Sequence, residues 1–401
     1  MFCRVCGNTE FYSFLNLGLQ PLANAVLTKE EFSIEKFYPL NIVICKNCHL
    51  PQLDHVVPPD ILFQNYPYFT GHAGKTWTEH LSELARILSE EFHIQHNDFV
   101  VDIGSNDGTL LQNFKCRVLG FEPAKNVAEE AINKGIPTSI KYFSLDNNVM
   151  ELAIFHKAQL ILCTNTFAHI DNWHELFCGV KVLLSEDGAF VVEVPHFLQL
   201  FLNKEYDTVY HEHLSYILVQ PLETLGKLFN LNLYRVEKLP THGGSLRLFF
   251  GKTQQIEDSV DTVKDEEFKS GIYNAESYVT FQNSVDKLAT DFRKLLYELW
   301  SENKTICGYG HPAKATVILN YCNLDPDIIS YITDLNPAKQ GKFSPGMHIP
   351  IVSPDVFHES PTDYAVMFPW NYKEEILELE KEFINNGGKF IIPLPKLEII
   401  P

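Results

Sequence analysis

Four of the nine cysteines stand in two Cys-x-x-Cys pairs, Cys3 with Cys6 and Cys45 with Cys48. Each pair can present two thiolates from one tight turn, and together they supply the closed tetrahedral site typical of structural zinc (Zn²⁺). The stretch between the pairs is longer than the about 15–20 residues of common zinc modules, so we expect a metal clip and not a DNA-reading finger. Buried cysteines without metal are the alternative. A site closed by four cysteines has no vacant position, so we expect no catalysis at this metal.

A glycine-rich turn follows the apolar run that ends at Asp102 and Ile103. Glu122 closes the next apolar run, at the distance of about 20 residues at which an acid can bind ribose hydroxyls. The turn lacks the Gly-x-Gly-x-x-Gly pattern of dinucleotide sites, and Asp107 within it repels a pyrophosphate but not a cationic sulfonium. The pattern therefore favours S-adenosylmethionine (SAM) over NAD, with a purely structural turn as the alternative. The predicted cofactor-binding residues are Asp102, Gly104, Ser105, Asn106, Gly108, Glu122 and Asn165.

Four ionisable or phenolic residues stand in a row at Tyr210-His211-Glu212-His213, and His169 follows an earlier apolar run. Ligands of open α/β sheets bind outside the carboxyl ends of the strands, where we expect both segments. A histidine can accept a proton, a carboxylate can orient that histidine, and a phenol can stabilise an enolate. We therefore predict that His213, Tyr210, Glu212 and His169 are catalytic. A solvated loop or a second metal site is the alternative.

A second glycine turn, Gly308-Tyr309-Gly310, precedes Lys314 near the start of a predicted helix. Backbone amides at a helix start, together with a lysine, can hold a diphosphate. Asp334 closes the apolar run that follows. A glycine turn that serves only packing is the alternative.

Apolar runs and helical patterns alternate along most of the chain, which predicts mainly parallel strands covered by helices on both faces. The strands expected in the first unit are residues 99–104, 117–122, 160–165 and 189–195, completed by a hairpin of 231–238 and 246–252. Its expected helices are residues 76–91, 126–134 and 174–184. In the second unit we expect strands at 305–310, 328–333, 364–367 and 389–392, and helices at 313–321 and 373–385.

These patterns predict an α/β protein in four parts. A small, loop-rich zinc-binding module is expected over residues 1–72, followed by a central Rossmann-like domain that binds SAM over 73–255. A helical connector over 256–303 then leads to a C-terminal Rossmann-like α/β domain over 304–401.

Composition and charge exclude several classes of protein. The 401 residues include 32 Lys and Arg against 51 Asp and Glu, a formal net charge of -19. This charge opposes binding to nucleic acid and to anionic membranes. No apolar run approaches about 18 residues and no secretory signal is visible. The other cysteines are expected to be small buried residues of a reducing compartment. We therefore expect a cytoplasmic monomer without nucleic-acid or membrane partners.

Ordered motifs along nearly the whole chain resemble one known family. They are the two cysteine pairs, residues 15–24, Asp102-x-Gly104, residues 165–169, 210–213, 242–245 and 308–314, and Trp370-Asn371. The chain is similar in these motifs to the sugar C-methyltransferases of deoxysugar biosynthesis, which act on nucleotide-linked ketosugars. The resemblance implies an N-terminal zinc module, a central SAM-dependent methyltransferase domain and a C-terminal domain that helps to bind the nucleotide. It also implies that Tyr66 and Tyr68 reach the sugar pocket. His311 departs from the pattern, which has a small residue there.

The residues and the resemblance together predict SAM-dependent methylation of the carbon next to the ketone of a nucleotide-linked deoxy-ketosugar, with thymidine diphosphate (dTDP) as the expected nucleotide. Such a carbon becomes nucleophilic once it loses its proton. We expect His213 to remove the proton, Glu212 to orient His213, and Tyr210 with His169 to stabilise the enolate. His211 and His213 can exchange roles. The alternatives are an O- or N-methyltransferase, an epimerase, or a non-catalytic zinc-containing binding protein. The predicted substrate-binding residues are Tyr66, Tyr68, His211, Gly308, Gly310 and Lys314.

Overall fold

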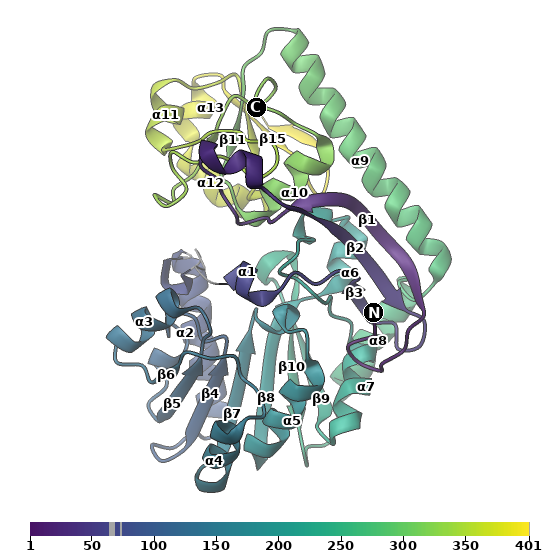
Figure 1. Cartoon of the computed structure of the whole chain (residues 1–401), viewed down its shortest axis with the longest axis vertical. Coiled ribbons are helices and arrows are strands. Elements are labelled where there is room, and N and C mark those ends of the chain that lie inside the picture. Colours follow the sequence, from purple (N-terminus) through teal and green to yellow (C-terminus); the bar gives the residue numbers. More distant parts are fainter. Residues whose placement is uncertain (64–68, 73, 401) are drawn as a thin grey trace.

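The computed structural model describes residues 1–63, 69–72 and 74–400. In this part of the chain, a small N-terminal sheet lies between a larger central sheet and a C-terminal sheet (Figure 1). The α/β class predicted from the sequence is confirmed. No helix in the same residues is long and apolar enough to cross a membrane.

The N-terminal sheet is antiparallel, in the order β1-β2-β3. Its strands are β1 (Phe11–Pro21), β2 (Phe37–Cys45) and β3 (Pro51–Leu53), and short helices follow them or lie between them at η1 (Lys29–Ile34), α1 (Pro59–Phe63) and η2 (Thr70–His72). The sequence predicts a loop-rich module here and does not identify these strands. Two register shifts in β1 break the alternation of apolar and polar residues that marks a strand. Packing against distant segments stabilises β1: the centre of the Phe14 ring lies 4.6 Å from that of Phe281 and 5.0 Å from that of Phe197.

The central sheet has the order β6-β5-β4-β7-β8-β10-β9, and only β10 runs antiparallel to its neighbours. Its strands are β4 (Phe99–Ile103), β5 (Arg117–Phe121), β6 (Thr138–Ser139), β7 (Ala158–Thr164), β8 (Leu184–Pro195), β9 (Asn232–Leu239) and β10 (Ser245–Gly251). The predicted hairpin is therefore confirmed, as are the predicted parallel strands. The parallel alignment brings the carboxyl ends of β4, β5, β7 and β8 to one edge of the sheet.

Helices and short turns connect these strands. They are α2 (Lys75–Glu91), η3 (Leu111–Asn113), α3 (Lys125–Asn133), α4 (Asn147–Phe155), η4 (Phe167–His169), α5 (Trp173–Leu183), α6 (Phe197–Asn203), η5 (Tyr206–Thr208), α7 (Val219–Phe229) and η6 (Thr241–Gly243). The three helices predicted for this unit correspond to α2, α3 and α5. Two further helices, α8 (Asp258–Lys269) and α9 (Ala275–Ser301), form the predicted helical connection, and α9 runs beside β1 (Figure 1).

The C-terminal sheet has the order β13-β12-β11-β14-β15-β16 and is parallel except for β16. Its elements are β11 (Ile306–Tyr309), α10 (Ala313–Cys322), β12 (Ile332–Thr333), β13 (Ile351–Val352), α11 (Pro354–Glu359), β14 (Tyr364–Met367), η7 (Trp370–Tyr372), α12 (Lys373–Leu379), α13 (Lys381–Asn385), β15 (Lys389–Ile392) and β16 (Glu398–Ile400). The helix predicted over 373–385 is divided at Glu380. That carboxylate is buried and accepts a hydrogen bond of 2.7 Å from the Tyr309 hydroxyl.

A buried carboxylate at the start of the helical connection joins three segments. Glu267 Oε1 lies 2.9 Å from His196 Nε2 and accepts a hydrogen bond of 2.8 Å from the Val219 amide. Its other oxygen accepts from the Tyr273 hydroxyl. Glu267 therefore links α8 to the segments that begin α6 and α7.

We predict that Glu267→Ala lowers the free energy of unfolding by about 3 kcal/mol, because it leaves buried donors unpaired. Urea unfolding followed by circular dichroism measures the change. The matched control is Glu266→Ala on the same helix. Glu266 is half-buried and pairs at 2.8 Å with the solvent-exposed Lys238, so its loss is expected to cost less than about 1 kcal/mol. Equal effects of the two substitutions would contradict the prediction.

Candidate active site and metal centre

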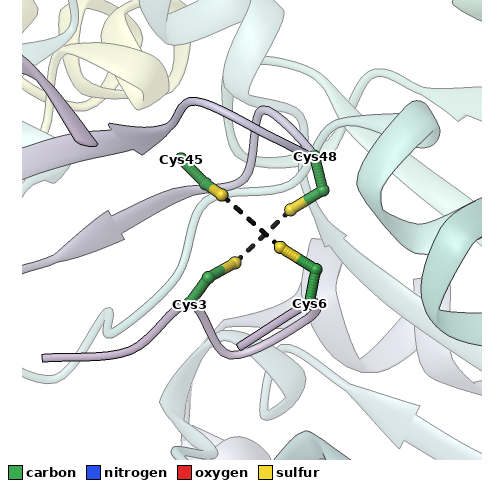
Figure 2. A group of neighbouring side chains, drawn as sticks. All are labelled: Cys3, Cys6, Cys45 and Cys48. Carbon is green, nitrogen blue, oxygen red and sulfur yellow. Dashed lines mark hydrogen bonds between the residues drawn. The ribbon is translucent and has the colours of Figure 1, made fainter. Parts of the chain in front are cut away.

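The predicted metal ligands Cys3, Cys6, Cys45 and Cys48 converge beside the N-terminal sheet (Figure 2). Their four Sγ atoms all lie within 4.8 Å of one another. Cys3 Sγ is 3.4 Å from Cys48 Sγ, and Cys6 Sγ is 3.6 Å from Cys45 Sγ. Ligands about 2.3 Å from a tetrahedral zinc ion lie about 3.8 Å apart, so four sulfurs at these separations fit zinc.

The loop between the first two cysteines is attached to the central sheet domain. Arg4 Nη1 donates to the carbonyls of Leu53, at 3.3 Å, and Leu214, at 3.0 Å. Arg4 Nε also pairs with Asp171 at 2.7 Å. Leu214 directly follows His213 in the chain, so the metal loop holds the backbone beside a predicted catalytic residue.

The glycine turn after β4 packs closely against its neighbours. The amides of Gly104 and Ser105 donate to the Phe121 carbonyl at 2.8 and 3.1 Å, which ties the turn to β5. A Cβ added to Gly104 would lie 2.2 Å from the Thr166 hydroxyl oxygen, and its φ of +74° lies in the left-handed region. Only glycine therefore allows the end of β4 to approach the end of β7 here. Asp102, at the end of β4, is buried beneath this turn.

Glu122 follows β5 and is brought beside the same turn. Its Oε2 accepts from the Asn106 amide at 3.1 Å, and its Oε1 accepts from the Ala124 amide at 2.8 Å. Asn106 and Gly108 both have a left-handed backbone. Burial raises the pKa of the Glu122 carboxyl. The structure therefore gathers the predicted cofactor-binding residues of β4 and β5 at one sheet edge.

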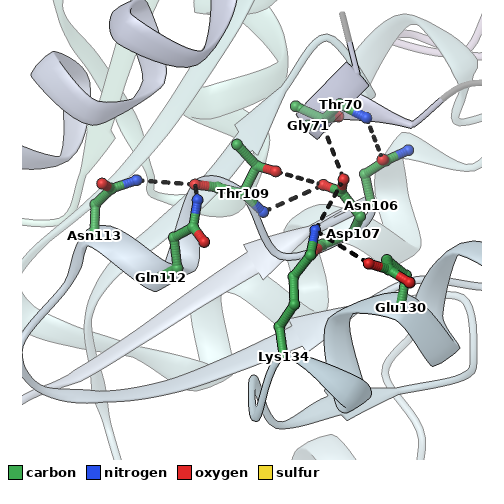
Figure 3. A network of polar contacts seen from close by, with 9 residues as sticks. All are labelled: Thr70, Gly71, Asn106, Asp107, Thr109, Gln112, Asn113, Glu130 and Lys134. Carbon is green, nitrogen blue, oxygen red and sulfur yellow. Dashed lines mark hydrogen bonds and ion pairs between the residues drawn. The ribbon is translucent and has the colours of Figure 1, made fainter.

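Asp107, in the same turn, has a different environment from the one that the sequence suggests (Figure 3). Its Oδ2 accepts from the Gly71 amide at 2.9 Å and pairs with Lys134 Nζ at 3.2 Å. Its Oδ1 accepts from the Thr109 hydroxyl at 2.7 Å. Asp107 therefore does not present an uncompensated charge that repels a pyrophosphate. Its contacts fasten the residues of η2 to the turn.

Two predicted catalytic histidines meet at the carboxyl edge of β7. The amide of Asn165, directly after β7, donates to the Glu193 carbonyl at 2.8 Å, and the chain then enters η4, which ends at His169. The His169 and His213 rings stack with centroids 5.2 Å apart, and the Tyr210 ring lies 4.1 Å from that of His213. Burial and the neighbouring His213 lower the pKa of His169 to about 3, so His169 is a neutral imidazole at physiological pH.

The structure distinguishes His213 from His211 by what their ring nitrogens contact. His213 Nδ1 lies 2.9 Å from the Thr208 carbonyl. A carbonyl can only accept, so the proton is on Nδ1 and the neutral ring has its lone pair on Nε2. His211 is buried, and its Nε2 lies 3.3 Å from the carbonyls of both Tyr38 and Pro39 in β2. His211 therefore faces the N-terminal sheet, whereas His213 faces His169 and Tyr210.

Glu212 is held by a residue to which the sequence analysis gave no role. Its buried Oε1 accepts from Asn24 Nδ2 at 2.7 Å. The Thr208 carbonyl lies against His213 Nδ1 and so also orients this ring, and the orientation of His213 by Glu212 stays a prediction. Asn24 lies in one of the motifs that carry the family resemblance, and this was the available signal. A main-chain carbonyl such as that of Thr208 leaves no signal in a sequence.

The glycine turn after β11 is tied to its own sheet. The amides of Gly308 and Gly310 donate to main-chain carbonyls at 2.8 Å, and the His311 amide donates to Asp334 Oδ2 at 2.7 Å. These three amides are thus engaged within the protein. Lys314, in the first turn of α10, places its Nζ 4.2 Å from the centre of the Trp370 ring. Of the predicted substrate-binding residues, Tyr66 and Tyr68 lie outside the described residues.

Three family models match successive parts of the chain. They are described as "Putative zinc binding domain" over residues 3–63, "Methyltransferase domain" over 76–236 and "C-methyltransferase C-terminal domain" over 240–395. The C-methyltransferase NovU of Streptomyces niveus is 36% identical to the chain over an alignment of 406 residues. The alignment covers 99% of this chain and 96% of NovU. The chain belongs to this C-methyltransferase family.

Two solved structures resemble parts of this C-methyltransferase. The PH0226 protein of Pyrococcus horikoshii is 15% identical, with 47% of this chain and 96% of that chain covered and a TM-score of 0.37. A SAM-dependent methyltransferase of Clostridium acetobutylicum is 16% identical, with 44% and 92% covered and a TM-score of 0.35.

The C-methyltransferase is a SAM-dependent enzyme, and the predicted cofactors, SAM and structural zinc, are confirmed. The turn after β4 fits a polar ligand such as SAM. Asp102 Oδ1 and Ser105 Oγ are buried there without a hydrogen-bond partner among the described residues, and Glu122 lies beside them. Asp102, Ser105 and Glu122 are the residues that would hold SAM, which supplies an electrophilic methyl group when bound.

We predict that SAM binds more tightly as the pH rises toward 8. Burial and the nearby Glu122 raise the pKa of Asp102 to about 8. The carboxyl is therefore neutral at pH 7, and a cationic ligand favours its ionised form, so binding at pH 7 releases a proton. Below this pKa the affinity is expected to fall by up to about tenfold per pH unit. Titration calorimetry between pH 6 and pH 9, in two buffers of different ionisation enthalpy, measures both effects.

S-adenosylhomocysteine is the matched control because it has the same amino group but lacks the sulfonium charge. Its affinity is expected to depend less on pH. The Asp102→Asn variant is expected to bind SAM with a flattened pH profile. A SAM affinity that stays constant between pH 6 and pH 9 would contradict the prediction.

Proposed function

We propose that this C-methyltransferase methylates the carbon next to the ketone of a nucleotide-linked deoxy-ketosugar, with dTDP as the nucleotide. The observation that carries the proposal is the group of His213, His169 and Tyr210 rings at the carboxyl edge of the central sheet. A base is needed there because a carbon next to a ketone becomes a nucleophile only when its proton is removed. The full-length similarity to NovU also supports carbon as the methyl acceptor.

In this proposal His213 is the base. Its Nδ1 proton is held on the Thr208 carbonyl, so Nε2 accepts the proton from the sugar carbon. His213 is preferred to His211 because the Nε2 of His211 is directed at two carbonyls of β2. Glu212, held by Asn24, joins the N-terminal module to this part of the site.

The enolate oxygen is stabilised by Tyr210 and His169. A phenol can donate a hydrogen bond to a developing oxyanion, and so can an imidazole N–H. Because the pKa of His169 is lowered to about 3, this ring stays neutral and does not take the proton from His213. The two rings adjoining His213 therefore have a role distinct from proton removal.

The C-terminal domain binds the nucleotide in this proposal. Lys314 is the cation that we assign to the diphosphate, because it lies near the 205–213 loop and Trp370. We also propose the division of the chain into parts at 1–72, 73–255, 256–303 and 304–401, and a cytoplasmic monomer. Tyr66 and Tyr68 remain predicted contacts of the sugar.

The experiment uses SAM with a ¹³C-labelled methyl group and a dTDP-linked 4-keto-6-deoxysugar. The proposal expects the label on a ring carbon beside the ketone, identified by a carbon–carbon coupling in the NMR spectrum of the product. Label on oxygen or nitrogen would overturn it. Inversion of a ring carbon without label transfer would indicate an epimerase instead.

A second measurement isolates the proton-removal step. In D₂O with S-adenosylhomocysteine in place of SAM, the enzyme is expected to exchange the hydrogen beside the ketone for deuterium. Exchange in the absence of a methyl donor reports the base alone. Its absence in a protein that still methylates the sugar would contradict a freely formed enolate.

A further inference from the structure

The segment that supports His213 is also held from the C-terminal domain. Thr208, whose carbonyl contacts His213 Nδ1, ends the short helix η5. Asp207, one residue earlier, is fully buried, and its Oδ2 accepts a hydrogen bond of 2.7 Å from Trp370 Nε1. Trp370 begins η7, in the segment that follows β14. An indole from the C-terminal part of the chain therefore contacts the residue next to the carbonyl that orients the proposed base.

The environment of Asp207 makes this contact important for the local backbone. Its Oδ1 has no hydrogen-bond partner in the described part of the chain. Burial raises the pKa of Asp207, and the positive charge of Lys314 acts in the opposite direction. Lys314 Nζ in turn lies 4.2 Å from the centre of the Trp370 ring. A buried carboxylate depends strongly on the few donors that reach it, so the indole N–H is one of the groups that fix its position.

We propose that Trp370 is a positioning residue for His213. Its indole N–H fixes Asp207, Asp207 fixes η5, and the Thr208 carbonyl at the end of η5 fixes the tautomer and the ring direction of His213. The inference rests on the proposed function, in which His213 is the base. This role accounts for Trp370 of the Trp370-Asn371 motif, which belongs to neither the metal site nor the cofactor turn.

A purely structural role for Trp370 makes a different prediction. If the ring only fills space, Trp370→Phe should lower stability without changing His213. Phenylalanine retains an aromatic face for Lys314 and fills much of the same volume, but it has no N–H to donate. The Trp370→Phe variant therefore removes the hydrogen bond while keeping most of the packing.

The decisive measurement is the ¹⁵N NMR spectrum of histidine-labelled protein, which distinguishes protonated from unprotonated ring nitrogens. The signals of His213 are assigned by their loss in His213→Asn. We expect wild type to show a protonated Nδ1 and Trp370→Phe to show a mixture of tautomers. Trp300→Phe, at an exposed position near the end of α9, is the matched control and should resemble wild type. An unchanged His213 spectrum in Trp370→Phe would overturn the proposal.

Kinetics and a conservative variant complete the test. Trp370→Phe is expected to lower kcat by about 10- to 100-fold, as for a misplaced catalytic group, with little change in KM for the sugar or in the affinity for SAM. Asp207→Asn still offers an oxygen to the indole and should keep the wild-type His213 tautomer, whereas Asp207→Leu should not. Loss of kcat with an unchanged His213 spectrum would also overturn the positioning role. If wild type methylates no ketosugar, the proposed function fails, while the spectra still decide the positioning role.

Discussion

Replacing His213 by asparagine is expected to lower kcat by about 10²- to 10⁴-fold, the usual contribution of a general base. The asparagine amide can still donate to the Thr208 carbonyl, so the local backbone should keep its path. It has no basic nitrogen to replace Nε2, however. Steady-state kinetics with a dTDP-linked ketosugar measures kcat, and calorimetry is expected to show SAM affinity close to that of wild type.

His211→Asn provides the comparison because His211 is two residues away and is held by the carbonyls of Tyr38 and Pro39. Its main expected effect is a lower melting temperature, with a much smaller fall in kcat. Deuterium exchange beside the ketone should stop in His213→Asn and continue in His211→Asn. The opposite outcome would transfer the role of base to His211.

The parts of the site that the sequence predicts depend on short chain distances. Two Cys-x-x-Cys pairs bring two sulfurs each into one turn, so only the meeting of the pairs depends on the fold. Asp102 and Glu122 end neighbouring parallel strands, and the carboxyl ends of such strands share an edge of the sheet. The geometry of a tight turn and the shared carboxyl edge of parallel strands were therefore sufficient to predict that these residues lie close together.

The contacts that the sequence does not predict join distant segments. Asn24 reaches Glu212, and Trp370 reaches Asp207, through the packing of the N-terminal and C-terminal parts on the 205–213 loop. The charge of Asp107 is visible in the sequence, but its partner Lys134 becomes a neighbour only when α3 packs beside the turn. Sequence patterns indicate which polar and charged groups are present, whereas the tertiary structure decides which hydrogen-bond or charge partner each group has.

Replacing Cys48 by serine is expected to abolish zinc binding and to lower both stability and activity. A structural zinc site contributes folding free energy directly, about 10 to 16 kcal/mol in small zinc-finger peptides. If only 3 to 5 kcal/mol of this is lost here, a domain of about 200 residues melts about 10 °C lower. Plasma emission spectroscopy measures the metal content, and scanning calorimetry measures the melting temperature. Cys178→Ser is the control, because Cys178 lies outside the four-cysteine cluster.

The loss of activity follows from what the metal loop holds. Arg4, between Cys3 and Cys6, donates to the Leu214 carbonyl, and the Leu214 amide donates to the Ala168 carbonyl beside His169. Release of this loop therefore loosens both histidines of the proposed site. Arg4→Met tests this step separately: it should keep zinc but lower kcat by up to about 10²-fold, since small misplacements of catalytic groups are costly. If Cys48→Ser lost its zinc yet kept the wild-type melting temperature and kcat, the metal centre would have no part in holding the active site.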